Sequence, residues 1–505
     1  MGDWTLLHWL ALMERELLLF AGVFFLIGAL DELLVDGLFG WLKLSGHAKR
    51  LVVDREDLRC RHLAGTAAVF IPAWREDRVI GHTIAHALQA WPQADYVIYV
   101  GIYRNDTATL ESAMRGAGTD RRVRLVVHDC DGPSTKADCL NRLYRALEVD
   151  ETRRGRPARL VLLHDAEDMV DAAELALIDR AVDHAEFVQI PVLPLPQPQS
   201  RWIGSHYCEE FAEAHGKTMV VRNWLGTCLP AAGVGCAIER GMLHRLAQQM
   251  RRADPGSPSP GPFSVESLTE DYEIGMRVHA LGGRSRFLRV HGDDGSLIAT
   301  RAFFPARLDQ AVRQKARWVH GIALQGWDRL GWGTGSGTAP EARPVTGMGR
   351  LLEGWMRLRD RRGPFAALVL ACGYSFFALT ALFLLLDFGG LSRPWQADPL
   401  LTFLVSANLA AFIWRAAWRF AFTAREHGWI EGVRAVLRIP VANVIAIMAG
   451  RRALADYWRQ LRGGALHWHK TLHDIHPAAP LDAAEKPLAP AHWRNGAMSG
   501  RGFAA

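Results

Sequence analysis

Two long stretches without a charged residue constrain the fold of this chain more than any other feature. Residues 365–386 are uncharged throughout. A helix of that length is about 33 Å long, which exceeds the bilayer core of about 30 Å. Residues 399–414 form a shorter apolar stretch that can return across the membrane. We therefore predict a transmembrane hairpin over residues 365–414.

The other stretch, residues 17–30, lies near the amino terminus. It lacks the features of a cleaved signal peptide, because the preceding MERE is acidic rather than basic and no small-residue cleavage site follows. We predict a membrane anchor over residues 1–43. Asp31, Glu32 and Asp36 lie in its second half, where carboxylates must face protein, lipid headgroups or water. An apolar span that simply ends near Leu30 is the alternative.

Positive charge flanks these stretches unequally. Six Lys or Arg residues lie between positions 43 and 61, against one before residue 17. The loop between the second and third stretches has one, and five Arg residues follow between positions 415 and 438. The positive-inside rule then predicts that the central region and the carboxyl end face the cytoplasm.

The formal net charge of +6 also bears on partners. Because no nucleic-acid motif is present, we attribute the basic excess to membrane lipids and phosphorylated substrates, and expect no nucleic-acid partner. The seven Cys residues have no paired metal-type spacing, so we expect free thiols in a reducing cytoplasm.

The region between the membrane stretches alternates β-rich runs with helical patterns. The strand candidates are residues 66–72, 96–103, 123–129, 159–165 and 187–193. This alternation predicts an α/β domain over residues 44–330, with a mostly parallel sheet covered by helices. In such sheets ligands bind beyond the carboxyl ends of the strands.

The remaining segments have less pattern. Residues 331–364 contain a run rich in Gly and Pro and are predicted to be a flexible linker. Residues 415–475 are predicted to form cytoplasmic interfacial helices, because the apolar run within 428–460 is too short to span. Residues 476–505 are rich in Ala and Pro and are predicted to be a disordered tail.

An acidic segment follows the fourth strand candidate. Residues 162–175, LLHDAEDMVDAAEL, concentrate carboxylates that repel one another unless a cation lies between them. Asp165 and Glu167 occupy alternate positions where the chain leaves the strand, so both can reach one Mg²⁺ or Mn²⁺ that also binds diphosphate oxygens. Asp168 and Asp171 fit the start of the next helix. An ordinary acidic surface is the alternative.

Two other positions can contribute charge to such a site. Lys136, in STKADCLN, opens a helix after a strand, where a Lys can meet a phosphate or a nucleotide carbonyl. Asp271, in SLTEDYEIG, lies in the first turn of a helix for which Ser267 and Glu270 have capping-box spacing. A carboxylate on a rigid element end suits a general base. The alternatives are a solvated helix start for Lys136 and a capping role for the acids.

A third helix combines polar and aromatic groups. Gln314, Arg317 and Trp318 are spaced i, i+3, i+4 and therefore share one face. An indole beside an amide and a guanidinium suits a sugar ring with a diphosphate nearby. An amphipathic helix at the membrane surface would have the same composition.

Residues 206–217, HYCEEFAEAHGK, contain two His and one Cys, but their spacing fits no common zinc pattern. We interpret the three Glu residues of this segment as a solvated helix face and expect no metal there.

The motifs in order resemble the processive family 2 glycosyltransferases, the group containing cellulose, chitin and hyaluronan synthases. The set is a D-x-D-like pair, T-E-D and Q-x-x-R-W, followed by membrane helices. The resemblance implies a GT-A (Rossmann-like) fold and a UDP-sugar donor held on Mg²⁺ or Mn²⁺. It also implies roles for the matching residues: metal binding for Asp165 and Glu167, the general base for Asp271, and substrate binding for Lys136, Asn141, Asp165, Glu270, Gln314, Arg317 and Trp318. Glu167 stands where the family has Asp.

Longer stretches, among them DELLVDGLFGWLK, VGIYRNDTAT and VESLTEDYEIGMR, resemble the transferase portion of the bacteriophage adsorption protein B family of inner-membrane glycosyltransferases. Relatives in that family carry a carboxyl-terminal cyclic-di-GMP-binding domain, which this chain does not match. The resemblance implies a multi-pass protein of the bacterial inner membrane with a cytoplasmic catalytic domain.

Together these resemblances imply an inverting transferase that adds sugar from a UDP-sugar to a growing β-linked exopolysaccharide. The implied partners are the donor, a glycan acceptor, membrane lipids, and either an outer-envelope export partner or a second copy of the chain. Two alternatives stay open. One is a non-processive transferase with a lipid-linked acceptor, and the other is a non-catalytic envelope scaffold or receptor that keeps the fold.

Overall fold

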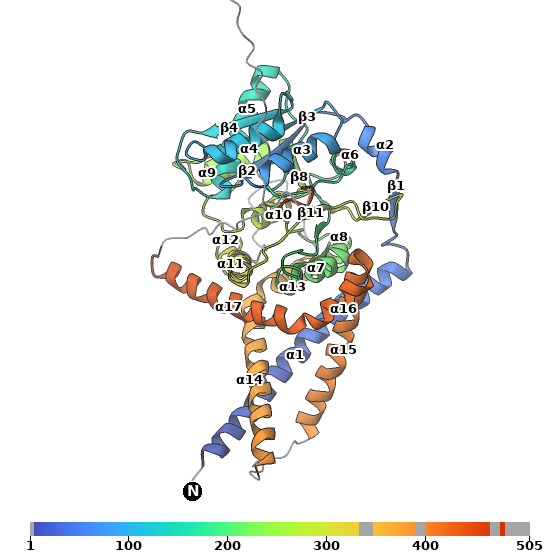
Figure 1. Ribbon diagram of the computed structural model, residues 1–505, viewed down its shortest axis with the longest axis vertical. Coiled ribbons are helices and arrows are strands. Elements are labelled where there is room, and N and C mark those ends of the chain that lie inside the picture. The colour runs from blue at the N-terminus through green and yellow to red at the C-terminus, as the bar shows by residue number, and fades with distance from the viewer. Residues whose placement is uncertain (1–4, 333–346, 390–398, 465–474, 480–505) are drawn as a thin grey trace, which may run out of the picture.

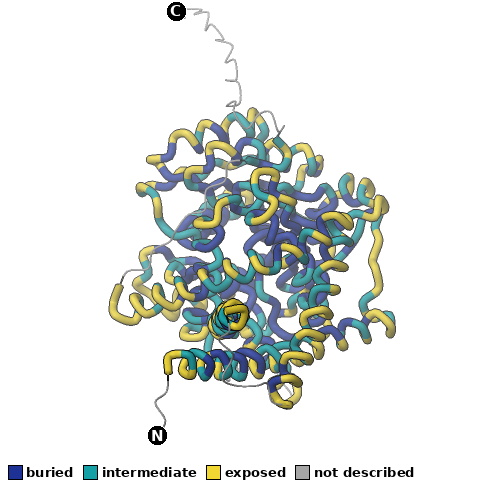
Figure 2. The backbone as a smooth tube through the Cα atoms, turned by 60° about the horizontal axis from the view of Figure 1, so that its bottom comes forward, coloured by how far each residue is buried: buried dark blue, intermediate teal, exposed yellow. Residues whose placement is uncertain are grey.

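The computed structural model describes residues 5–332, 347–389, 399–464 and 475–479. An α/β unit forms one end of the molecule, and long helices extend from the other (Figure 1). Figure 2 shows that buried residues are concentrated in the interior of the molecule and that exposed residues lie on its outer helices and loops.

A seven-stranded sheet forms the centre of the α/β unit. Its order is β4-β3-β2-β5-β8-β6-β9. The bounds are β2 (Ala67–Ala73), β3 (Tyr96–Tyr103), β4 (Val123–His128), β5 (Leu160–Leu163), β6 (Phe187–Gln189), β8 (Cys236–Glu239) and β9 (Ser285–Phe287). Only β8, among the described strands of this sheet, runs antiparallel to its neighbours. The predicted mostly parallel α/β sheet is therefore confirmed.

Strand residues alternate between two apolar cores, because successive side chains point to opposite faces of a sheet. Along β2, Val69 and Ile71 enter one core, and Ala68 and Phe70 enter the other. The first core is covered by α3 (Ile80–Ala90), α4 (Thr107–Ala117) and α6 (Glu174–Ala181). The second is covered by α5 (Lys136–Arg154), α9 (Arg240–Ala253) and α10 (Glu270–Ala280).

The strand predicted over residues 187–193 is two strands in different sheets. β6 ends at Gln189, and β7 (Val192–Pro194) pairs with β11 (Thr300–Ala302). Pro191 lies between them and has no N–H to continue the ladder. A further parallel pair, β1 (Leu51–Val53) with β10 (Val290–Gly292), lies beside α2 (Arg55–Cys60).

The rest of the described chain is mainly helical. The bounds of these helices are α1 (Leu6–Leu44), α7 (His206–Glu213), η1 (Ala214–Thr218), α8 (Met219–Leu225), α11 (Leu308–Val319), η2 (His320–Gln325), α12 (Gly326–Leu330), α13 (Gly347–Arg361), α14 (Gly363–Phe388), α15 (Pro399–His427), α16 (Trp429–Leu437) and α17 (Ile439–Leu461). Helix α15 continues to His427, past the predicted end of the hairpin at residue 414. By length and composition, α1, α14 and α15 can each cross a membrane. The pair α16 and α17, bent by 53°, lies across the base of the α/β unit (Figure 1).

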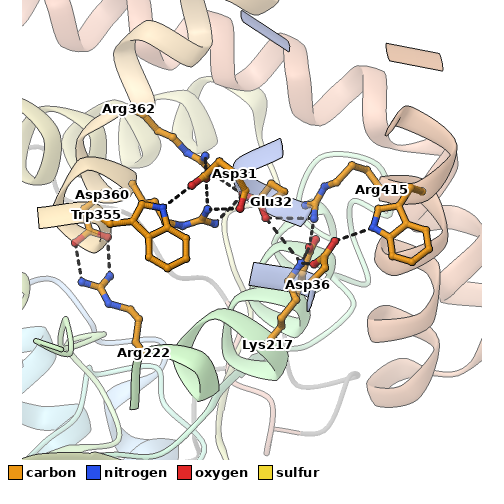
Figure 3. Close-up of polar contacts among 12 residues, drawn as sticks. Asp31, Glu32, Asp36, Lys217, Arg222, Trp355, Asp360, Arg362 and Arg415 are labelled. Atoms are coloured by element: carbon orange, nitrogen blue, oxygen red, sulfur yellow. Dashed lines mark hydrogen bonds and ion pairs between the residues drawn. The ribbon is translucent and has the colours of Figure 1, made fainter. Parts of the chain in front are cut away.

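Helix α1 is longer than a membrane is thick. Its 39 residues extend for about 58 Å, so it cannot lie wholly within a bilayer core of about 30 Å, and the three acids of the predicted anchor are in its second half. There Asp31 receives a hydrogen bond from Trp355 at 2.6 Å, and Glu32 is 3.3 Å from Arg415. Asp36 pairs with the buried Lys217 (Figure 3). The acids of the anchor therefore face protein cations.

The segment predicted as a flexible linker contains a helix, so that prediction is wrong for α13; residues 333–346 lie outside the described residues. Asp360 accepts hydrogen bonds from Arg222 at 2.7 Å and from the Tyr272 hydroxyl at 3.0 Å. Glu353 accepts from the Cys228 backbone nitrogen at 2.9 Å and from Arg357 one turn later at 2.7 Å. Gly and Pro dominate only the first part of the segment, and these polar contacts order the rest.

Two further expectations differ from the structure. The Glu residues of α7 do not form one solvated face, because Glu210 is exposed but Glu209 is fully buried and pairs with Arg438 at 2.7 Å. The tail predicted to be disordered from residue 476 begins with a buried side chain, His476. Residues 480–505 lie outside the described residues.

Candidate active site

Two adjoining cavities lie beyond the carboxyl ends of β2 and β5. Their volumes are about 80 Å³ and about 100 Å³. The residues that line both are Lys136, Asp165, Glu167, Gln314 and Arg317. These five come from three separate predicted motifs, and the position is the one expected for a ligand in a sheet of this kind.

The acidic loop, residues 164–171, leaves β5 and presents its carboxylates to both cavities. Asp165 Oδ1 lies 2.5 Å from the Lys136 ammonium group. The Asp165 backbone nitrogen donates to Asp168 Oδ2 at 2.9 Å, and that oxygen also lies 3.0 Å from His164 Nδ1. Asp168 therefore holds the loop in shape. Asp168 was predicted to lie at the start of the next helix, but α6 begins only at Glu174.

Two acids, Asp168 and Glu174, flank His164. Burial by itself would lower the pKa of this imidazole, but the carboxylates of Glu174 and Asp168 raise it to about 10. The side chain is buried, with Nε2 2.9 Å from Glu174. The charged His164 therefore offsets part of the negative charge that accumulates behind the loop.

Lys136 joins the acidic loop to the start of α10. Thr135 caps α5 by accepting from the Asp138 nitrogen at 3.1 Å, which fixes Lys136 at the first position of the helix. Its Nζ is 4.0 Å from Glu270 as well as bonded to Asp165. Burial would lower the pKa of this amine, but Asp165, Glu270 and Asp271 raise it well above its usual value. Lys136 is therefore charged at neutral pH.

Glu270 and Asp271 open α10 and line the smaller cavity. Burial and the neighbouring Asp271 raise the pKa of Glu270 to about 7. Burial also raises the pKa of Asp271 above its usual value, against the opposing charges of Lys136 and Arg317. A carboxylate with a raised pKa is a stronger base at neutral pH. The predicted capping box does not form, because the N-cap is Thr269.

A glycine that the sequence reasoning missed holds the other side of Asp271. Gly233 has φ +83°, and a Cβ atom built on it would lie 2.4 Å from Asp271 Oδ2. Both the left-handed conformation and the close approach require a residue without a side chain. The stretch AAGVGC, with two glycines of positive φ before β8, was the available signal.

Helix α11 closes the site from the membrane side. Gln314, Arg317 and Trp318 line the smaller cavity, as their predicted common face requires. Gln314 Oε1 and Arg317 Nε are buried, and neither has a hydrogen-bond partner among the described residues. Buried polar atoms of this kind need a partner, so these two atoms are suited to a polar ligand.

The aromatic wall of the smaller cavity was not predicted beyond Trp318. Phe211 and Phe304 line the cavity with it. Their ring centroids lie 6.3 Å and 6.4 Å from that of the indole, with steep interplanar angles. Phe211 comes from α7 and Phe304 from the loop after β11, so only the folded chain brings these rings together.

Asn141 is the one predicted substrate residue that lines neither cavity. It is fully buried, and its amide donates to the carbonyls of Ser259 at 3.0 Å and Phe263 at 2.9 Å. It also accepts from the Phe263 nitrogen at 3.0 Å. Asn141 therefore binds the backbone of the loop before α10. The motif had predicted that it contacts the substrate.

The residues of the acidic loop are suitable for a divalent cation. Asp165 already contacts one cation, the ammonium group of Lys136. Mg²⁺ and Mn²⁺ prefer carboxylate oxygens and take several further oxygen ligands from substrate phosphates and water. Among the described residues no group of three His, Cys, Asp or Glu side chains could hold a metal. Two carboxylates, from Asp165 and Glu167, with the remaining positions left to a ligand, therefore fit this donor set.

A sequence model of the family described as "Glycosyltransferase like family 2" matches residues 64–321. Two curated relatives are each 31% identical over 447 residues, a match that covers 83% of this chain: bacteriophage adsorption protein B of Escherichia coli (strain K12) and bacteriophage N4 adsorption protein B of Escherichia coli O157:H7. The match covers 56% of either relative, so the chain spans about half the length of the curated relatives it matches.

Solved structures of low similarity also match. A mannosyltransferase from Pyrobaculum calidifontis in complex with GDP-Man and Mn²⁺ is 15% identical, with a TM-score of 0.48 over 86% of this chain and 99% of that one. A Mycobacterium tuberculosis glucosyl-3-phosphoglycerate synthase in complex with Mn²⁺, UDP and phosphoglyceric acid is 16% identical, with a TM-score of 0.32 over 55% and 81%.

Proposed function

Because the chain belongs to glycosyltransferase family 2, we propose that it transfers sugar from a UDP-sugar to a growing β-linked exopolysaccharide at a membrane surface. It is a family 2 glycosyltransferase with the GT-A fold and three membrane-length helices. The observation that carries the finer proposal is the convergence of Asp165, Asp271 and Arg317 on one cavity. A scaffold that had lost activity would have no use for this convergence.

Asp165 and Glu167 are the residues that would hold Mg²⁺ or Mn²⁺. The bound ion would neutralise negative charge on the diphosphate of the leaving UDP. Arg317 also lines both cavities and can donate to the same diphosphate, since its Nε has no partner among the described residues. Lys136 supplies a further positive charge between the two groups of acids.

The larger cavity suits the nucleotide. Trp74 and Tyr103 line it, and their ring centroids lie 5.2 Å apart with the planes near perpendicular. A base can stack on an aromatic face there, and Ser134 in the same lining can hydrogen-bond to it. The sugar would then extend toward Asp271 in the smaller cavity.

Asp271 is the proposed general base. One of its carboxylate oxygens takes the proton of the acceptor hydroxyl, whose oxygen forms a bond to the anomeric carbon. The bond between that carbon and the diphosphate oxygen breaks, and UDP leaves with the electron pair. Because attack and departure occur on opposite faces, one displacement inverts the configuration and a β-linkage results from an α-linked donor.

Trp318, Phe211 and Phe304 form the proposed acceptor wall. Sugar rings have apolar faces that pack against aromatic rings, while their hydroxyls bind amides such as that of Gln314. The proposed location is the bacterial inner membrane with the α/β unit in the cytoplasm. Basic flanks of the membrane-length helices support that orientation.

A lipid-linked acceptor, modified once, is the second candidate. It is favoured by the arrangement of the described membrane-length helices, because α14 and α15 both pack on α1 and diverge from each other (Figure 1). Three membrane-length helices are few for a polymer channel, so a polymerase would need a second copy or an export partner. Product length distinguishes the candidates: a ladder of long products supports polymerisation, and a single added sugar supports the lipid-linked acceptor.

The activity is tested with membranes that contain the full chain, a panel of radiolabelled UDP-sugars, and Mg²⁺ or Mn²⁺. We expect Asp271→Asn to lower the rate by about two to four orders of magnitude, since it removes a general base, while UDP binding changes little. Asp165→Ala should abolish incorporation as well. Near-normal transfer by Asp271→Asn would overturn the assignment of the base. Absence of transfer with every donor and either metal would favour the scaffold.

A further inference from the structure

The acidic loop is held through its backbone carbonyl groups. The Thr83 hydroxyl donates to the carbonyl of Ala166. His86 Nε2 lies 3.0 Å from the carbonyl oxygen of Val170. Both side chains belong to α3. A buried carbonyl group needs a hydrogen-bond donor. Beyond the end of β5 no neighbouring strand in the described part of the chain supplies one, and these two side chains do so instead.

The carbonyl oxygen of Asp168 has a partner from a distant part of the chain. It lies 3.0 Å from Nε2 of His476, which is 308 positions later in the sequence. The His476 side chain is 1% exposed, and its ring lies parallel to that of His82, with the centroids 6.2 Å apart. In Figure 1 the short red segment around His476 lies near β11, inside the α/β unit.

The direction of this hydrogen bond follows from the turn itself. The backbone nitrogen of Ala478 lies 3.0 Å from His476 Nδ1. An amide nitrogen can only donate, so Nδ1 accepts and the proton of the neutral ring is on Nε2. Nε2 therefore donates to the Asp168 carbonyl. Burial lowers the pKa of His476 to about 4, which keeps the ring neutral.

Asp168 connects the hydrogen bond from His476 to the two carboxylates proposed to bind the metal. Its carboxylate accepts the backbone N–H of Asp165, and its own nitrogen follows Glu167 directly. A displacement of Asp168 would therefore shift both carboxylates proposed to bind the metal. Metal ligands must be held within about 0.5 Å of their productive positions, so a donor that fixes this backbone affects the site.

We propose that His476 is a positioning residue of the donor site, which fastens the acidic loop by donating from Nε2 to the Asp168 carbonyl. The proposal rests on the proposed function for what the loop binds. The turn of residues 475–479 follows α17, so the chain returns from the membrane-side helices to the metal-binding loop. Residues 475–479 are thereby part of the catalytic unit.

Three substitutions in the full chain separate the hydrogen bond from packing. His476→Phe keeps a ring of similar size and removes the donor. His476→Gln keeps an amide donor near the position of Nε2, and His476→Asn carries the same group one methylene shorter. The control is His62→Phe, because the His62 side chain is 93% exposed and 3.7 Å from its nearest acid.

The primary measurement is hydrogen–deuterium exchange of peptides that cover residues 164–171. Mn²⁺ affinity in the presence of UDP is measured alongside it from the signal of free Mn²⁺ in electron paramagnetic resonance. We expect faster loop exchange in the Phe and Asn variants and Mn²⁺ affinity weaker by about 10–100-fold, as for other groups that orient metal ligands. The Gln variant and the His62 control should resemble wild type. kcat should fall with Mn²⁺ affinity, while the acceptor KM stays unchanged.

Unchanged loop exchange in the Phe variant would overturn the proposal, and so would equal behaviour of the Gln and Asn variants. If the Phe variant does not fold, the comparison of Gln with Asn still decides. A different result addresses the proposed function separately. If loop exchange responds as expected but wild type binds no Mn²⁺ with UDP, the fastening by His476 stands and the proposed metal-dependent transfer is wrong.

Discussion

Replacement of Gly233 by Ala should slow transfer about 100-fold through a displacement of Asp271. The added Cβ would lie 2.4 Å from Asp271 Oδ2. An ordinary contact between nonbonded heavy atoms is about 3.5 Å, so the carboxylate must retreat by about 1 Å. A misplacement of about 1 Å in a catalytic group costs about 100-fold in rate. Donor binding should change little, because the nucleotide cavity is lined by other residues.

The substitution also forces a side chain into the left-handed region, at a cost of about 1–2 kcal/mol in the free energy of unfolding. Gly226→Ala is the matched control for this loss of stability. Gly226 has φ +66°, and nothing lies within 4 Å of a Cβ built there. Both variants should therefore lose stability, and only Gly233→Ala should lose most of its activity.

The assay is the initial rate of incorporation of labelled sugar by the purified full chain, with donor KM and the thermal unfolding midpoint measured on the same samples. If Gly233→Ala and Gly226→Ala retain equal kcat values, the position of the Asp271 carboxylate has no bearing on transfer. The reasoning that makes Asp271 the base would then be refuted.

Three further predictions follow from the electrostatics. The positive charge of Arg317 lowers the pKa values of Glu270 and Asp271, so Arg317→Gln should raise both. The acid limb of the plot of kcat against pH should then move to higher pH. An unmoved limb would show that Arg317 has no electrostatic effect on these acids. Arg438→Ala leaves Glu209 buried without its partner and should cost about 3–5 kcal/mol in stability, read as a lower thermal midpoint; an unchanged midpoint would contradict this. Burial lowers the pKa of His215 to about 4, below its unfolded value of about 6.5, so its contribution to stability is complete above pH 6.5 and is lost as the pH falls toward 4. Wild type should lose about 2 kcal/mol more stability than His215→Asn between pH 7 and pH 5, and parallel losses would refute the assignment.

Local patterns in the sequence predicted most of the α/β framework. Continuous apolar runs such as residues 96–103 identify buried parallel strands, and β3 has the predicted bounds. β8 has four residues and follows a glycine-rich loop, so no run was long enough to indicate it. Its antiparallel position between β5 and β6 depends on partners far apart in sequence.

In the candidate site, too, local patterns could be predicted and contacts between distant segments could not. Spacing on one helix predicted that Gln314, Arg317 and Trp318 share a cavity, because helical periodicity is local. The contact of Lys136 with both Asp165 and Glu270 joins three elements and could not be read from spacing. Gly233 and the aromatic partners of Trp318 were missed for the same reason. Asn141 was assigned to substrate from its motif alone, and its contacts instead hold residues 259–263.

Helix α13 shows how composition can mislead. The Gly- and Pro-rich residues that precede it suggested a linker throughout, yet Glu353, Arg357 and Asp360 follow at helical spacing. Their partners include Arg222 of α8 and the backbone of Cys228 in the loop after that helix. Polar contacts across the fold, which no single segment encodes, decide that this part of the chain is ordered.

The most direct test of the central claim is a structure of the full chain bound to Mn²⁺ and a non-hydrolysable UDP-sugar. The account predicts the ion at Asp165 and Glu167, the diphosphate between the ion and Arg317, and the anomeric carbon facing Asp271. Nucleotide density on another surface, or a sugar turned away from Asp271, would contradict it.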